Sequence, residues 1–218
     1  DLKYFVDNIV NSPAITGGQT HSQTHKKIYI LAHSMGAAIA TLYLQTEKPA
    51  VDAVAFSSPM YELHLGKYSL VQAKALLLKA KVLGKMDEYI PDGKGFDYEA
   101  KFLDNHLTHS PARFNLFQEQ VKAEPVLAVG DPAYRWVGAA FDGYEHIMKN
   151  AKNYKYPTLI FQAGKDLVVQ IRSQDIFIKD APSCQKIFFP NAFHEIISEE
   201  DVIREPAINA ALAFFESH

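Results

Sequence analysis

The sequence has few of the residues that build disulfide frameworks, metal clusters and nucleic-acid-binding surfaces. Its 218 residues include one cysteine, Cys184, which excludes an internal disulfide and any zinc site built from several cysteines. Lys and Arg total 22 against 25 Asp and Glu, and they are scattered, so no basic stripe indicates nucleic acid as a partner. His21 and His25 lie in a polar stretch, and we interpret them as loop residues. We therefore expect no bound metal and no nucleic-acid partner.

Long apolar runs are also lacking, since each ends well before the roughly 18 residues that a membrane-spanning helix needs. The chain opens at Asp1 on a helical pattern, with apolar residues at Leu2, Phe5, Val6 and Ile9. Because this resembles the middle of an amphipathic helix, we expect the natural protein to continue before Asp1. Any targeting signal would then lie in that upstream segment.

Strand-like and helix-like segments alternate at both ends of the sequence. Short apolar runs rich in β-branched and aromatic residues, typical of buried parallel strands, occupy 26–32, 51–57, 156–163 and 186–189. Helical patterns occupy 35–45, 170–179 and 199–216. The last of these has an expected apolar face of Val202, Ile203, Ile208, Ala211, Leu212 and Phe215. This alternation predicts an α/β fold with a mostly parallel sheet and helices on both sides.

The middle of the sequence, 60–155, has a different pattern. Helical pieces at 71–83, 99–107 and 113–122 are separated by turns rich in Gly, Pro and Asp, and no run of comparable strand character appears. We interpret 60–155 as a helical insertion between two strands, with 1–59 and 156–218 forming the core.

The clearest chemical signal is a serine at a strand-to-helix turn. Ser34 follows the strand at 26–32 and precedes a helix, with small residues, Ala32 and Gly36, two positions away on either side. Such a turn is strained and crowded, and it holds the serine hydroxyl above the edge of the sheet. Backbone N–H groups at the start of the helix point toward developing negative charge, so we expect the N–H of Met35 to be an oxyanion donor.

A serine nucleophile needs a base, and the base needs an orienting carboxylate. Asp166 and His194 each follow a predicted strand, in the chain order serine, acid, histidine that goes with a serine at such a turn, at the edge where open α/β sheets place their sites. We therefore predict Ser34 as nucleophile, Asp166 as acid and His194 as base, without a cofactor. Singly, each could be only a turn or helix-flanking residue, and Asp142 and Asp175 are alternatives for the acid.

Four segments resemble one known family. The run 31–40 is similar to the nucleophile turn of the lysophospholipase and monoacylglycerol lipase branch of the α/β-hydrolases. The segments 107–110, 130–137 and 193–196 resemble the bacterial lysophospholipases of this branch. The resemblance implies an α/β-hydrolase fold whose N-terminal strands are missing from this chain, with 60–155 as a helical cap. It also implies hydrolysis of a carboxylic ester in a lysophospholipid or monoacylglycerol.

The same resemblance implies a lipid or small-ester substrate, peripheral contact with a membrane, and a location in the bacterial cytoplasm or at the inner membrane face. We count His33, Trp136 and Phe141 as candidate substrate-binding residues. Further cap side chains could line an acyl-chain pocket or could instead only pack the cap onto the sheet; they are Leu76, Leu77, Leu78, Phe102, Phe114, Leu116 and Phe117. The family's usual Gly is replaced by Ala32, and its second oxyanion donor belongs to a segment that would lie upstream.

Two other functions fit the same pattern. One is a general carboxylesterase or peptidase, because fold alone does not fix the substrate. The other is a non-enzymatic binding protein built on a hydrolase scaffold, which predicts that no activated serine is present.

Overall fold

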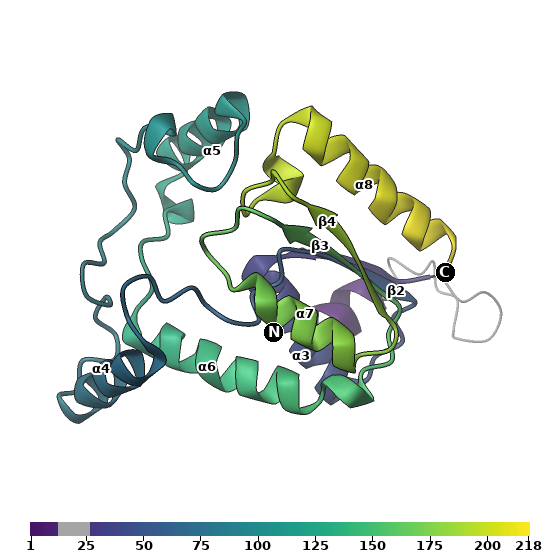
Figure 1. Cartoon of the computed structure of the whole chain (residues 1–218), viewed down its shortest axis with the longest axis horizontal. Helices are drawn as coiled ribbons and strands as arrows, with labels where there is room; N and C mark the ends of the chain where they lie inside the picture. The colour runs from purple at the N-terminus through teal and green to yellow at the C-terminus, as the bar shows by residue number, and fades with distance from the viewer. Residues whose placement is uncertain (13–26) are drawn as a thin grey trace.

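A four-stranded parallel sheet organises the chain. The computed structural model describes residues 1–12 and 27–218, so the predicted loop histidines His21 and His25 lie outside the described residues. The strands pair in chain order, and every pair is parallel, which confirms the predicted sheet (Figure 1). Their bounds are β1 (Tyr29–His33), β2 (Ala53–Ser57), β3 (Thr158–Ala163) and β4 (Cys184–Phe189).

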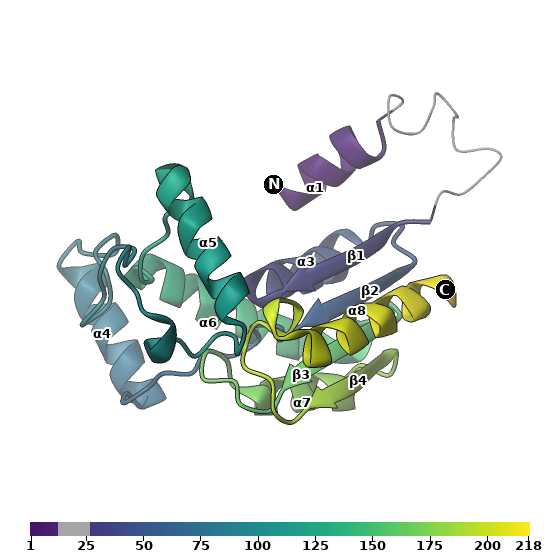
Figure 2. The same ribbon diagram turned by 90° about the horizontal axis from the view of Figure 1, so that it is seen from above.

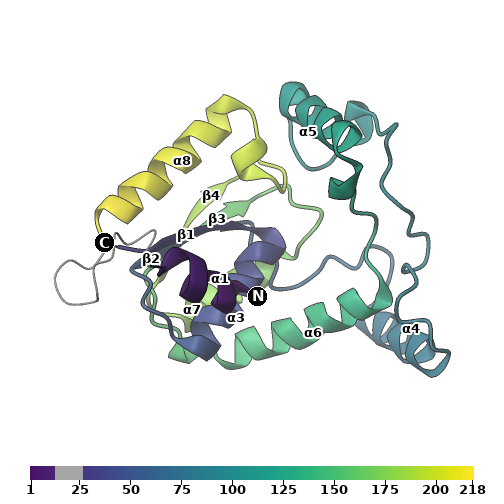
Figure 3. The same cartoon turned by 180° about the vertical axis from the view of Figure 1, so that it is seen from behind.

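Helices cover both faces of this sheet, as the alternation predicts. Figure 1 and Figure 3 show α8 on one face and α3 and α7 on the other, with α1 packed against α3. Their bounds are α1 (Leu2–Phe5), continued by the π-helical turn η1 (Val6–Val10), α3 (Ser34–Glu47), α7 (Ile171–Asp180) and α8 (Asp201–Glu216), which follows the 3-10 turn η5 (Ile196–Ser198).

The period of two along each strand divides the core into two clusters. In β2, Val54 and Phe56 pack with α3 and α7, whereas Ala53 and Ala55 pack with α8. All five residues of β2 and all six of β3 are buried, which explains why both strands read as nearly continuous apolar runs in the sequence.

The residues between β2 and β3 form the helical part of the molecule. Figure 2 shows its helices α4, α5 and the start of α6 beyond one end of the sheet. The last turn of α6 returns to the core, where Ile147 is buried in the same cluster as the inner residues of α3, and Ala151 of the following turn η4 is buried there too. The elements are α4 (Leu70–Val82), η2 (Phe102–Asp104), α5 (Pro111–Ala123), η3 (Pro125–Leu127), α6 (Tyr134–Lys149) and η4 (Ala151–Asn153).

Two helical features differ from the sequence-based expectation. The helix expected at 99–107 is only the 3-10 turn η2, because the Asn105 side chain bonds the backbone N–H of Leu107 and Thr108 and the Thr108 carbonyl. Such local bonds compete with a helix. Helix α6 was not singled out from the sequence. It packs against α3, and a Cβ added at its Gly143 would make an ordinary contact with Leu42, at 3.7 Å.

The expected face of α8 is partly wrong. Val202 is 77% exposed and Leu212 is 54% exposed, whereas the buried residues are Ala207, Ala211 and Phe214. Two of these three are alanines, whose small side chains let this part of the helix lie close to the sheet. None of the helices in the described residues is long and apolar enough to span a membrane.

Candidate active site

The turn between β1 and α3 holds Ser34 in a left-handed backbone conformation. Its φ is +49°, which costs a non-glycine residue roughly 1–2 kcal/mol. The N–H of Met60 donates to the Ser34 carbonyl at 3.0 Å and helps to fix the turn. A Cβ built on Gly36 meets no described atom within 4 Å, so the crowding expected at that position is not seen among the described residues.

The structure brings Ser34, His194 and Asp166 together as a continuous hydrogen-bonded chain. Nε2 of His194 lies 2.9 Å from Oγ of Ser34, and Nδ1 lies 2.7 Å from Oδ2 of Asp166. The other carboxylate oxygen of Asp166 accepts from the N–H groups of Val168 and Val169 at 2.8 and 3.0 Å. The side chains of His194 and Asp166 are 4% and 0% exposed, so water scarcely reaches their contact.

Hydrogen-bonding capacity assigns the tautomer. A carboxylate can only accept, so Nδ1 of His194 carries the proton and Nε2 is free to accept from the Ser34 hydroxyl. This arrangement can remove the proton of Ser34 while Asp166 holds the ring. The alternative acid Asp175 instead forms an ion pair with Lys186, and Asp142 lies on α6.

Two loops are joined tightly where they carry the acid and the base. The N–H of Gly164 donates to the Phe189 carbonyl at 2.9 Å, and the N–H of Lys165 donates to the Ala192 carbonyl at 3.0 Å. A Cβ on Gly164 would lie only 2.5 Å from the Pro190 carbonyl oxygen, so the close approach requires glycine. Gly164 is not among the site residues predicted from the sequence. The available signal was a glycine that directly follows a predicted strand, two residues before a candidate acid.

His33 lies beside the base and does not line either cavity described below. Its Nδ1 lies 3.1 Å from the Ser57 carbonyl oxygen, and its ring centre lies 4.8 Å from that of His194. Burial, followed by the neighbouring His194, lowers the pKa of His33 from 6.5 to about 4. The ring is therefore neutral near pH 7, with its Nδ1–H donated to Ser57.

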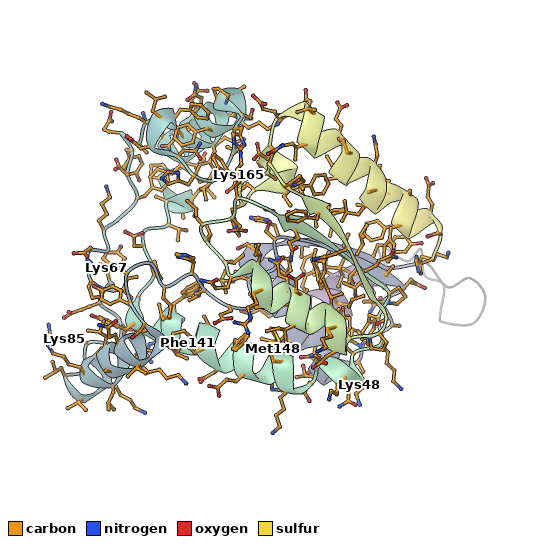
Figure 4. The ribbon with its side chains drawn as sticks, viewed as in Figure 1. Lys48, Lys67, Lys85, Phe141, Met148 and Lys165 are labelled. Carbon is orange, nitrogen blue, oxygen red and sulfur yellow. The ribbon has the colours of Figure 1, made fainter. Side chains whose placement is uncertain are left out.

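A mostly apolar cavity of about 860 Å³ opens at Ser34. Among the predicted pocket residues, Leu76, Leu77 and Trp136 line it, and the indole N–H of Trp136 points at the Met35 sulfur, 3.2 Å away. Phe141 does not line it; Figure 4 shows this residue further along α6, in the direction of Met148. Leu78 and Phe102 also lie outside its lining.

A second, more polar cavity of about 910 Å³ lies next to the first. Leu167 and Val168, which follow Asp166, line both. Phe114, Leu116 and Phe117, which were expected at the acyl pocket, lie here instead, together with Arg113, Arg204 and Glu195. Burial raises the pKa of Glu195 above its usual range.

The geometry of this site agrees with the comparison to known proteins. The profile of the family described as serine aminopeptidase, S33, matches residues 2–201. The chain belongs to this α/β-hydrolase family. The S33 chain is 32% identical over 200 residues to lysophospholipase L2 of Escherichia coli K12, covering 88% of the chain and 58% of that protein. It is 26% identical to the probable lysophospholipase L2 of Haemophilus influenzae, covering 98% of the chain and 66% of that protein.

Solved structures confirm the fold of the S33 chain. A monoglyceride lipase variant from Saccharomyces cerevisiae, in complex with a substrate analogue, superposes with a TM-score of 0.72 at 20% identity. The match covers all of this chain and 68% of that one. The monoacylglycerol lipase of Paleococcus ferrophilus gives a TM-score of 0.64 at 18% identity, covering 88% and 70%. The family match and the two lysophospholipase L2 relatives confirm the resemblance to the lysophospholipase and monoacylglycerol lipase branch.

Proposed function

We propose that this chain carries the catalytic residues of a serine hydrolase that cleaves the carboxylic ester of a lysophospholipid or monoacylglycerol. The observation that carries the proposal is the hydrogen-bonded chain from Ser34 through His194 to Asp166, which opens on an apolar cavity. The names of the Escherichia coli and Haemophilus influenzae relatives favour a lysophospholipid.

The reaction follows from the positions of these groups. Ser34 Oγ attacks the ester carbonyl carbon while Nε2 of His194 takes the hydroxyl proton, and Asp166 stabilises the imidazolium. The oxyanion faces the N–H of Met35 at the start of α3. When the ester C–O bond breaks, His194 gives its proton to the leaving alcohol. Water then attacks the acyl-serine with His194 again as base, which releases the fatty acid and restores Ser34.

The cavity at Ser34 suits the acyl chain. Its volume falls in the range of ligand pockets, about 300–1,000 Å³, and its walls are largely aliphatic and aromatic. Leu76, Leu77 and Trp136 come from the insertion, so residues 60–155 act as a cap that covers the acyl chain.

We also propose peripheral contact between this cap and a lipid surface, on the cytoplasmic side of a bacterial membrane. Val71, Leu78 and Val82 are 78%, 64% and 76% exposed. Their spacing of seven and four residues places them on one outer stripe of α4. An exposed apolar stripe on the element that covers the acyl cavity is suited to meeting membrane-borne substrate.

The function is tested by hydrolysis of esters that differ only in acyl length and head group. We expect higher kcat/KM for long-chain lysophospholipids or monoacylglycerols than for short-chain esters of the same alcohol, and no turnover in Ser34→Ala. Preference for short acyl chains would favour the general carboxylesterase instead. Absence of turnover on every ester by the folded protein would contradict the proposal.

A further inference from the structure

Glu199 is a buried carboxylate outside the proposed catalytic residues, and N–H groups surround it. Its side chain has no solvent exposure. Oε1 accepts from the Phe193 N–H at 2.7 Å and lies 2.8 Å from His109 Nδ1, while Oε2 accepts from the His109 N–H at 2.8 Å and the Glu200 N–H at 3.3 Å. Burying a carboxylate is costly unless hydrogen-bond donors surround it. The donors around Glu199 therefore favour a carboxylate at this position over a side chain that also donates.

Hydrogen bonds hold the backbone on either side of His194. Glu199 accepts the N–H of Phe193, the residue before His194. The His194 carbonyl accepts from the Ser58 hydroxyl at 2.7 Å, and the next N–H, of Glu195, donates to the Leu107 carbonyl at 2.9 Å. The placement of the His194 ring against Ser34 therefore depends on contacts made by the backbone of its loop.

The same cluster reaches into the helical insertion. His109 lies just before α5, and its ring stacks on Phe193 with centres 3.8 Å apart and planes 15° apart. The Thr108 hydroxyl donates to the Ser198 carbonyl at 2.6 Å, and the Arg113 guanidinium donates to the Glu199 carbonyl at 2.7 Å. The beginning of α5 and the loop that carries His194 are thus held as one unit.

We infer that Glu199 is a positioning residue, which fixes the His194 loop directly and ties the cap to that loop through His109. The inference rests on the proposed function, because it assigns Glu199 a part in aligning the proposed base. Glu199 acts through the backbone of Phe193 and touches neither Ser34 nor the cavity at Ser34. Its loss is expected to lower the rate of chemistry more than the affinity for substrate.

Glu199→Gln tests this with little change in shape, since it replaces one acceptor oxygen by an NH₂ group that must face N–H donors. We expect kcat for a long-chain ester to fall at least about tenfold, with KM within about twofold, because small misplacement of a catalytic group costs up to about a hundredfold. Glu200→Gln is the matched control, because Glu200 is exposed, adjacent and changed in the same way. It should behave as the parent.

A second readout does not depend on turnover. The Nδ1–H proton of His194 should give a resolved downfield NMR signal that moves or broadens in Glu199→Gln and stays unchanged in Glu200→Gln. If the signal responds while the parent protein hydrolyses no ester, the proposed function fails and the positioning role stands.

His109→Ala covers the case in which Glu199→Gln does not fold. It removes the ring that bonds Glu199 and stacks on Phe193 but keeps the backbone N–H. We therefore expect a smaller fall in kcat and a smaller change in the His194 signal than in Glu199→Gln. A folded Glu199→Gln, or failing that a folded His109→Ala, with parental kcat and an unchanged His194 signal would overturn the inference. A rise in KM at constant kcat would overturn it as well.

Discussion

Three histidines near the sheet edge differ in what their Nδ1 atoms contact. Nδ1 of His194 meets the Asp166 carboxylate, that of His109 meets the Glu199 carboxylate, and that of His33 meets the neutral Ser57 carbonyl. Only His194 also has Nε2 on a serine hydroxyl. The partners of the ring nitrogens therefore distinguish the proposed base, His194, from His109, which bonds the buried Glu199, and from His33, which is neutral near pH 7.

The low pKa of His33 makes stability depend on pH. Below pH 6.5 His33 of the unfolded chain binds a proton that the folded protein does not bind until about pH 4. The contribution of His33 to the free energy of unfolding is therefore complete above pH 6.5 and is lost as the pH falls toward 4. Lowering the pH from 7.5 to 5.0 should cost about 2 kcal/mol from this group. His33→Asn keeps an N–H donor but does not titrate. Urea unfolding at both pH values should show a smaller loss in His33→Asn, and an equal loss would contradict the role of burial.

The sequence predicted the residues of the hydrogen-bonded chain because each follows a strand of a parallel sheet. Ser34, Asp166 and His194 meet since the carboxyl ends of such strands share one edge. Glu199 could not be chosen in the same way, because its burial depends on contacts with His109, which lies 90 positions away in the sequence. The triad roles, the Met35 oxyanion donor and the part of His33 and Phe141 in substrate binding remain predictions.

Buried strands were predicted more closely than the helices of the insertion. A strand buried on both faces reads as an apolar run whatever surrounds it, as β2 and β3 do. Helix α6 has two environments, since Trp136 and Val137 line the cavity at Ser34 whereas Ile147 packs in the core. The apolar residues of α6 therefore face two different surfaces along its length, and which part of the helix meets which surface depends on the fold around it.

The junction of the β3 and β4 loops is testable through Gly164. Gly164→Ala should place its Cβ against the Pro190 backbone and lower the free energy of unfolding by about 1–3 kcal/mol. Gly138→Ala in α6 is the control, because its Cβ meets no described atom within 4 Å and alanine favours a helix by up to about 1 kcal/mol. Denaturation curves should move in opposite directions. Equal stability of the two variants would mean that the loops relax without cost.

Over the whole molecule, the proposed chemistry lies between the carboxyl edge of the parallel sheet and the helical residues that join β2 to β3. The cavity at Ser34 and the second cavity share the wall formed by Leu167 and Val168. The exposed apolar stripe of α4 lies on the insertion, away from the core helix α8 (Figure 1). The same part of the chain therefore supplies walls of the cavity at Ser34 and the stripe that we propose to meet lipid.

Lipid contact through this stripe predicts cosedimentation with phospholipid vesicles. Val71→Ser combined with Val82→Ser should weaken binding, because two exposed apolar side chains are removed from one face of α4. Val202→Ser combined with Leu212→Ser removes similar exposed side chains from α8 and should leave binding unchanged. If both double variants bind as the parent does, the membrane does not meet α4.

The most direct measurement is covalent labelling of the folded protein by a fluorophosphonate probe, with the modified residue located by mass spectrometry. We predict modification at Ser34, none in Ser34→Ala, and labelling slowed by roughly a thousandfold or more in His194→Ala. Modification of a different serine, undiminished labelling in His194→Ala, or no labelling of the folded protein would contradict the assignment of Ser34 as an activated nucleophile.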